Sequence, residues 1–217
     1  MIGYCPKHNI SWSIPTPNAP CPKCTDEAKT PVPPTVIVVA GQDLAKHRDY
    51  STYVSLAIQD KVAKVQKLNL WPHTDCSVVM EDTVRFYKED GCRELGVDQS
   101  NAGEPLLEQY EAMGIHVTGV LFTQTTKDEM ITYTRNLLQR KKAGIPPYLE
   151  LPRSGPFVEE LLTQMKEQER IIGASERPHY DHPAGRHDDL LWALNIACYV
   201  ARPHLSNPYF VWGPGYS

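Results

Sequence analysis

The chain has 217 residues, of which 41% are hydrophobic and 22% charged, and its formal net charge is −4. This balance is typical of a folded globular protein, and the length allows one sizeable core with a small appendage. The acidic net charge excludes a general attraction to nucleic acid, so any contact with DNA must come from a local basic surface. No apolar run approaches the roughly 20 residues that span a bilayer. The N-terminus has no basic segment followed by an apolar one, the pattern of a signal peptide. We therefore expect an intracellular protein that is neither secreted nor bound to a membrane.

The N-terminal 30 residues carry a Cys-x2-His pair and a Cys-x2-Cys pair, formed by Cys5, His8, Cys21 and Cys24. Two short turns of this kind can place four nitrogen and sulfur ligands at the corners of a tetrahedron, which Zn²⁺ prefers in structural sites. Disulfides are the alternative, but intracellular proteins seldom keep them. The spacing predicts that residues 1–30 form a zinc-binding knuckle in which structural Zn²⁺ supplies much of the folding free energy.

A proline-rich linker at residues 31–34 separates this knuckle from a main domain at 35–203, and residues 204–217 form a C-terminal tail. Each proline fixes φ, so the linker is expected to be stiff. The main domain opens with branched apolar residues over 36–43, which predict a buried central strand that ends at Asp43. Strand-like segments at 52–59 and 61–70 follow after short turns, and together the three predict an antiparallel meander.

Helices and strands alternate after the meander. Apolar spacing predicts helices over 77–90, 104–113, 126–142 and 157–170, and a last helix that opens at 185–189 and runs to 201. Strands are predicted over 94–98, which ends at Asp98, and over 116–122. Such alternation implies right-handed crossovers, with the first, fourth and fifth strands parallel. The predicted fold class is therefore α/β, with a mixed five-stranded sheet flanked by helices.

Acidic residues recur where these elements end or begin. Asp43 and Asp98 end two strands of the parallel set, and Asp188 and Asp189 lie in the first turn of the last helix. Turn formation or helix capping is one explanation, because carboxylates are favoured at a helix N-terminus. However, functional groups gather at the carboxyl ends of neighbouring strands, and converging carboxylates repel one another unless they bind cations. All-oxygen ligands suit Mg²⁺ or Mn²⁺, and two such ions can promote phosphodiester hydrolysis.

The order of these motifs resembles the nuclease domain of viral (phage-type) large terminase subunits, which belong to the RNase H-like superfamily. The resemblance covers residues 35–203 and is carried by Gly41-Gln42-Asp43, Asp49-Tyr50-Ser51, Gly96-Val97-Asp98, Lys127 and His187-Asp188-Asp189. It implies an RNase H-like fold and an endonuclease that cuts double-stranded DNA during packaging with two Mg²⁺ or Mn²⁺ ions. By the same resemblance the catalytic, metal-binding acids are Asp43, Asp98 and Asp188, with Asp189 as a further ligand and Asp49, Lys127 and His187 as auxiliary residues.

The sequence departs from this family in two ways. It contains no G-x-x-x-x-G-K-[ST] loop, so we expect any ATPase motor or portal-type partner to be a separate component. The predicted zinc knuckle is not a feature of the usual terminase nuclease. Two alternatives therefore stay open, namely a structure-selective, junction-resolving nuclease of the same superfamily and a catalytically inactive, zinc-dependent binding or scaffold module.

Overall fold

The computed structural model describes residues 2–7, 9–13, 20–23, 35–45, 50–139, 148–172, 178–181 and 187–205. The chain divides into two compact units, Met1–Thr35 and Val36–Ser217. In the first unit, strand β1 (Ile2–Cys5) pairs antiparallel with β2 (Ile10–Ser13), so that Cys5 lies opposite Ile10. No helix in the described ranges is long and apolar enough to cross a membrane.

The second unit is built on a six-stranded mixed sheet with the strand order β7-β6-β3-β4-β5-β8. Its strands are β3 (Ile37–Asp43), β4 (Tyr50–Gln59), β5 (Val62–Pro72), β6 (Cys92–Asp98), β7 (Val117–Val120) and β8 (Leu149–Glu150). The antiparallel meander β3-β4-β5 and the parallel set β3, β6 and β7 are confirmed. The predicted number of five strands was wrong. The sixth strand, β8, has two residues and pairs parallel with β5, and so short a segment shows no alternating pattern in the sequence.

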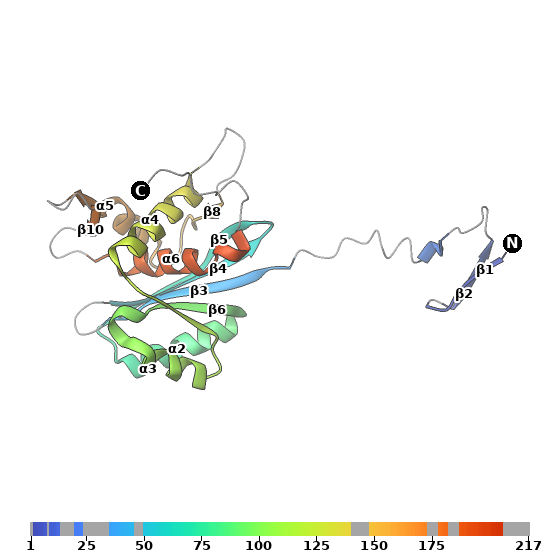
Figure 1. The fold of residues 1–217 in the computed structure, drawn as a ribbon, viewed down its shortest axis with the longest axis horizontal. Helices are drawn as coiled ribbons and strands as arrows, with labels where there is room; N and C mark the ends of the chain where they lie inside the picture. Colours follow the sequence, from blue (N-terminus) through green and yellow to red (C-terminus); the bar gives the residue numbers. More distant parts are fainter. Residues whose placement is uncertain are drawn as a thin grey trace. The chain divides into compact units, whose positions relative to one another are not determined.

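Helices cover both faces of this sheet (Figure 1). One face carries α2 (Cys76–Glu89) and α3 (Gln99–Ala112), and the other carries α4 (Gln124–Leu138), α5 (Val158–Glu167) and α6 (Asp189–Val200), which is followed by the short α7 (Arg202–Leu205). Side chains alternate along β3, so Val39 packs in the cluster with α6 while Val38 and Ala40 pack in the cluster with α2 and α3. The sheet is therefore buried on both sides, as its branched apolar residues predict.

Several helix boundaries differ from those predicted. Helix α5 ends at Glu167 rather than Arg170, because the following residues form β9 (Glu169–Ile172), which pairs antiparallel with β10 (Pro178–Asp181). Helix α3 starts at Gln99 and is kinked at Gly103, whose φ of 67° is not helical. Helix α4 (predicted over 126–142) ends at Leu138, because Gln139 is already extended. Residues 140–142 and the predicted tail beyond 205 lie outside the described residues.

Helix α6 packs unusually closely against the sheet. Ten of its residues are buried, from Leu190 to Val200. A Cβ added at Gly41 of β3 would overlap the carbonyl oxygen of Ala193 and the amide nitrogen of Ala197, so only glycine permits this approach. The close contact holds the N-terminus of α6 at the carboxyl end of β3, where the predicted acids lie.

Candidate active site

Four predicted acidic residues lie at one edge of the sheet. Asp43 ends β3 and Asp98 ends β6, and these parallel strands are direct neighbours. Asp188 is the N-cap of α6 and Asp189 is its first residue. The Thr52 hydroxyl on β4 donates a 2.8 Å hydrogen bond to the main-chain oxygen of Asp189, and Thr52 itself pairs with Asp43. The beginning of α6 is thereby fixed beside the end of β3.

The electrostatics of Asp43 show how close this group is. Withdrawal from water raises the pKa of the Asp43 carboxyl well above its usual value, and the negative charges of Asp189, Asp98 and Asp188 raise that pKa further. The Lys127 ammonium acts in the opposite direction and lowers the pKa of Asp43. Burial is the largest cause although Asp43 keeps some solvent exposure. The other three carboxylates and the lysine thus all act on Asp43, and we call these five residues the acid cluster.

Hydrogen bonds and ring contacts orient the members of this cluster. Asp98 Oδ1 accepts a 2.8 Å bond from the amide of Ser100, and Asp188 Oδ2 accepts a 2.8 Å bond from the indole nitrogen of Trp192. The Lys127 ammonium lies 4.8 Å from the centroid of the Trp192 ring and 5.2 Å from that of Phe122. His187 Nδ1 lies 3.6 Å from Asp189 Oδ2. Asp49, a predicted auxiliary residue, lies outside the described residues.

The donor set of the acid cluster suits a hard divalent cation, because all its ligating atoms are carboxylate oxygens. The repulsion that raises the pKa of Asp43 is also the repulsion that a cation would relieve. Among the described residues, however, no three His, Cys, Asp or Glu side chains form a ready-made metal site. Asp98 and Asp188 each use one oxygen in a hydrogen bond to the protein.

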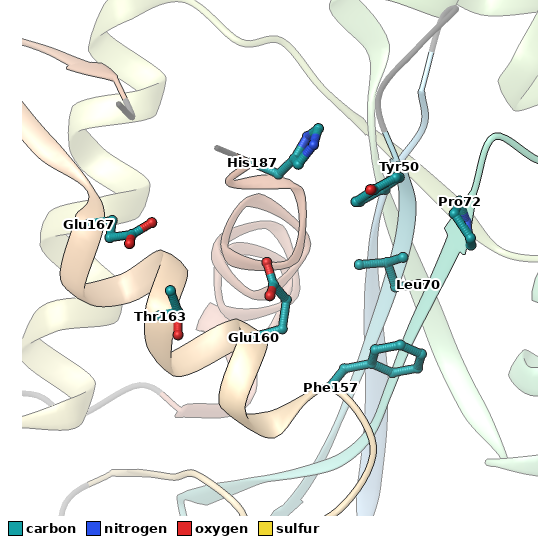
Figure 2. A pocket seen from close by; sticks show the side chains of 8 residues that line it. All are labelled: Tyr50, Leu70, Pro72, Phe157, Glu160, Thr163, Glu167 and His187. Carbon is teal, nitrogen blue, oxygen red and sulfur yellow. The ribbon is translucent and has the colours of Figure 1, made fainter. Parts of the chain in front are cut away.

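Sequence reasoning missed two features beside the acid cluster. A cavity of about 420 Å³ opens between α5 and the ends of β4 and β5, and Tyr50 and His187 line it (Figure 2). Gln164 of α5 is 2% exposed, and its side-chain oxygen accepts a 3.0 Å bond from the amide of Leu191 in the first turn of α6. Gln164 occupies a buried position after Val158 and Leu161, so a polar residue on an apolar stripe was the available signal.

The predicted zinc ligands are only partly described. Cys5 and Cys21 are both buried, with 7% and 6% exposure, whereas His8 and Cys24 lie outside the described residues. The zinc knuckle therefore stays a prediction.

The second unit has the fold of large terminase nuclease domains, which is the RNase H-like fold that the sequence predicts. The nuclease of the large terminase from thermophilic phage G20c, solved with bound magnesium, matches with a TM-score of 0.64 and 19% identity over 76% of this chain and 81% of that chain. The Thermus phage P74-26 large terminase nuclease domain matches with a TM-score of 0.61 and 20% identity, over 75% of this chain and 78% of that chain. The nuclease domain of the large terminase subunit gp2 of bacterial virus Sf6 matches with a TM-score of 0.60 and 14% identity, over 75% of this chain and 87% of that chain.

Two comparisons by sequence found no match for this chain. No family model matches it, and no curated protein matches it. At identities this low the structural comparisons establish the fold, and the chemistry has to be argued from the acid cluster itself.

Proposed function

We propose that this protein is a metal-dependent endonuclease that hydrolyses phosphodiester bonds of double-stranded DNA. The observation that carries the proposal is the acid cluster, in which the neighbouring strand ends of Asp43 and Asp98 meet the first turn of α6 with Asp188 and Asp189. Burial raises the pKa of Asp43, and the three neighbouring carboxylates raise it further. The likeness in fold to the terminase nucleases supports it, and one of these was solved with bound magnesium. By the same analogy the DNA would be viral and the cut would accompany its packaging, with a separate ATPase motor or portal-type protein as partner.

The acidic residues divide the work in this proposal. Asp43, Asp98 and Asp188 would hold two Mg²⁺ or Mn²⁺ ions, with Asp189 as a further ligand, and Asp49 stays an auxiliary candidate. When bound, the ions would activate the attacking water and stabilise the departing 3′-oxygen. Asp43 is the residue on which the other three charges converge, so it gains most from a neighbouring cation.

Lys127 and His187 would support the acids. The Lys127 ammonium lies over the rings of Trp192 and Phe122, which leaves a positive charge beside the acid cluster to contact a phosphate oxygen. His187 Nδ1 lies 3.6 Å from Asp189 Oδ2, so a protonated His187 would form an ion pair with that carboxylate.

Plasmid nicking in Mn²⁺, in Mg²⁺ and in EDTA tests this function. We expect nicking with either metal, no nicking in EDTA, and loss of nicking in Asp98→Asn. Asp60→Asn is the matched control, because Asp60 makes the turn between β4 and β5 at the opposite end of the sheet and undergoes the same chemical change. Full activity of Asp98→Asn would overturn the proposal. A much faster cut of branched DNA than of linear duplex would instead favour the structure-selective, junction-resolving nuclease.

A second candidate function is a catalytically inactive, zinc-dependent binding or scaffold module. It is favoured by the Cys-x2-His and Cys-x2-Cys pairs near the N-terminus and by the acidic net charge of −4. The test is to treat the protein with EDTA under conditions that leave its zinc bound, and then to add Mn²⁺. Failure to cut DNA would establish this alternative.

For the first unit we propose that Cys5, His8, Cys21 and Cys24 hold one structural Zn²⁺. The burial of Cys5 and Cys21 in a segment too small for its own core supports this proposal. Elemental analysis of the purified protein should find one zinc per chain. Cys21→Ser should lose the metal, whereas Cys76→Ser should keep it, because Cys76 is an exposed residue of α2 in the second unit.

A further inference from the structure

The cavity beside the acid cluster has two different walls. Figure 2 shows α5 on one side, with Glu160 and Thr163 facing the space, and the ends of β4 and β5 on the other, with Tyr50 and Leu70. His187, just ahead of α6, closes the upper end. Its volume of about 420 Å³ is enough for a flat ring system.

This cavity shares a wall with the acid cluster. His187 immediately precedes Asp188, and its Nδ1 lies 3.6 Å from Asp189 Oδ2. On the other side, Tyr50 is two residues before Thr52, which pairs with Asp43. A group attached to a phosphate at the acid cluster would therefore have this open cavity beside it.

The lining favours a flat, neutral group over a phosphate. The rings of Tyr50 and His187 lie 4.4 Å apart at 32°, and Leu70 and Pro72 add apolar surface. The acidic lining comes from α5, where Glu160 and Glu167 share one face with Thr163, and no lysine or arginine among the described residues lines the cavity. Carboxylates repel phosphate but accept hydrogen bonds from N–H groups, so the lining matches a nucleobase with an amino group on its edge.

The carboxylate of Glu160 is held in place for this task. Its Oε1 accepts a 3.0 Å hydrogen bond from Gln164 Nε2. Oε1 of the buried Gln164 in turn accepts a hydrogen bond from the amide of Leu191 in α6. The acceptor in the cavity and the helix that carries Asp188 and Asp189 are thus connected through one side chain.

Backbone strain marks the same place. Phe157, which also lines the cavity, has a φ of 61° in the left-handed region. This conformation is costly for a bulky residue, and such costs cluster at binding and catalytic sites.

We propose that the cavity receives an unpaired nucleobase of the strand that lies across the acid cluster. The base stacks on Tyr50 and donates hydrogen bonds from its amino edge to Glu160. The inference rests on the proposed nuclease function for the position of the strand, and it adds that one nucleotide next to the cut leaves its base pair when the DNA is bound. Cytosine, adenine and guanine carry an exocyclic amino group on that edge, whereas thymine offers only its N3–H, which lies between two carbonyl oxygens that a carboxylate repels.

The test is binding of single strands by the full chain in Ca²⁺, followed by fluorescence anisotropy. Labelled oligodeoxycytidine and oligodeoxythymidine of equal length are compared, and we expect the cytidine strand to bind about tenfold more tightly. Glu160→Gln should bring the ratio of the two dissociation constants close to one, because the amide no longer repels thymine. Glu159→Gln is the matched control, since the neighbouring exposed glutamate loses the same charge and does not line this cavity.

Equal affinity of the wild-type protein for both strands would overturn the inference, as would a preference that survives in Glu160→Gln. Isothermal titration with arginine amide and with deoxycytidine monophosphate separates a protein partner from a base. Heat from arginine amide alone, lost in Glu160→Gln, would assign the cavity to a guanidinium and also overturn the inference.

Failure of this inference differs from failure of the proposed function. Binding is measured without cleavage, so an inactive protein that keeps its preference for the cytidine strand would remove the nuclease function and leave the base site standing. An active nuclease with no preference would do the reverse.

Discussion

Gly41 of β3 lies directly against the backbone of Ala193 in α6. A Cβ at Gly41 would overlap the Ala193 carbonyl oxygen and stand 3.0 Å from the Cα of Ala197. Because backbone atoms cannot move aside as a side chain can, Gly41→Ala should lower the free energy of unfolding by about 3 kcal/mol or more. Urea denaturation measures this change.

Gly96→Ala is the control for that substitution. Its added Cβ would meet the ends of two side chains, Ile196 Cγ2 at 2.6 Å and Val200 Cγ1 at 2.8 Å. These groups can rotate, so the loss should be smaller, on the order of 1 kcal/mol. Equal losses at Gly41 and Gly96 would mean that α6 can shift away from the sheet.

Asp43→Asn should stabilise the metal-free protein at neutral pH. The folded protein raises the pKa of Asp43 above its ordinary 3.8, so the ionised carboxylate opposes folding. That group's contribution to stability falls as the pH rises from 3.8 toward the raised pKa, and the amide has no such loss. In EDTA the melting temperature of Asp43→Asn should therefore exceed that of the wild type. Added Mn²⁺ should raise the melting temperature of the wild type only. A lower melting temperature of Asp43→Asn than of the wild type in EDTA would contradict a destabilising charge at Asp43.

Gln164→Met should destabilise the protein through α6. The methionine has a similar volume but cannot accept the hydrogen bond from the Leu191 amide, which would be left buried. An unsatisfied buried donor costs about 1–3 kcal/mol, and urea denaturation should show a loss of that size. Gln66→Met is the control, because Gln66 is exposed on β5 and its substitution should leave the stability nearly unchanged.

The thiols of the second unit should differ sharply in reactivity. Burial raises the pKa of Cys92 to about 11 and that of Cys198 to about 12, whereas Cys76 is exposed on α2. Since the thiolate is the reactive form, Ellman's reagent at pH 8 should modify Cys76 quickly and the two buried thiols only after unfolding. Cys76→Ser should abolish the rapid phase from this unit. Rapid labelling of Cys198 in the folded protein would show that α6 opens locally.

The sheet was predictable wherever the sequence carries its own pattern. Branched apolar residues before Asp43 and the alternation of strands and helices gave the meander and the parallel set. Strand β8 was not predictable, because Leu149 and Glu150 become a strand only through pairing with Ala63 and Lys64. The same holds for β9, whose residues suit a helix until β10 supplies a partner.

The candidate site was predictable to a similar extent. Asp43 and Asp98 were found because each ends a recognisable strand, and parallel strands bring such ends together. Tyr50 and Glu160 were not found, because they come together only when β4 and α5 pack around the beginning of α6. Tyr50 was noted only as part of the Asp49-Tyr50-Ser51 motif, and Glu160 does not stand out in its segment.

The burial of α6 also determines how the protein should fail on heating. Asp188 and Asp189 are anchored to a helix enclosed by the sheet and by α4 and α5. Its amide protons should be among the last to exchange with deuterated solvent, and no partial opening should release the two aspartates alone. Inactivation by heat and collapse of the hydrophobic interior should then occur in one transition, at the same temperature.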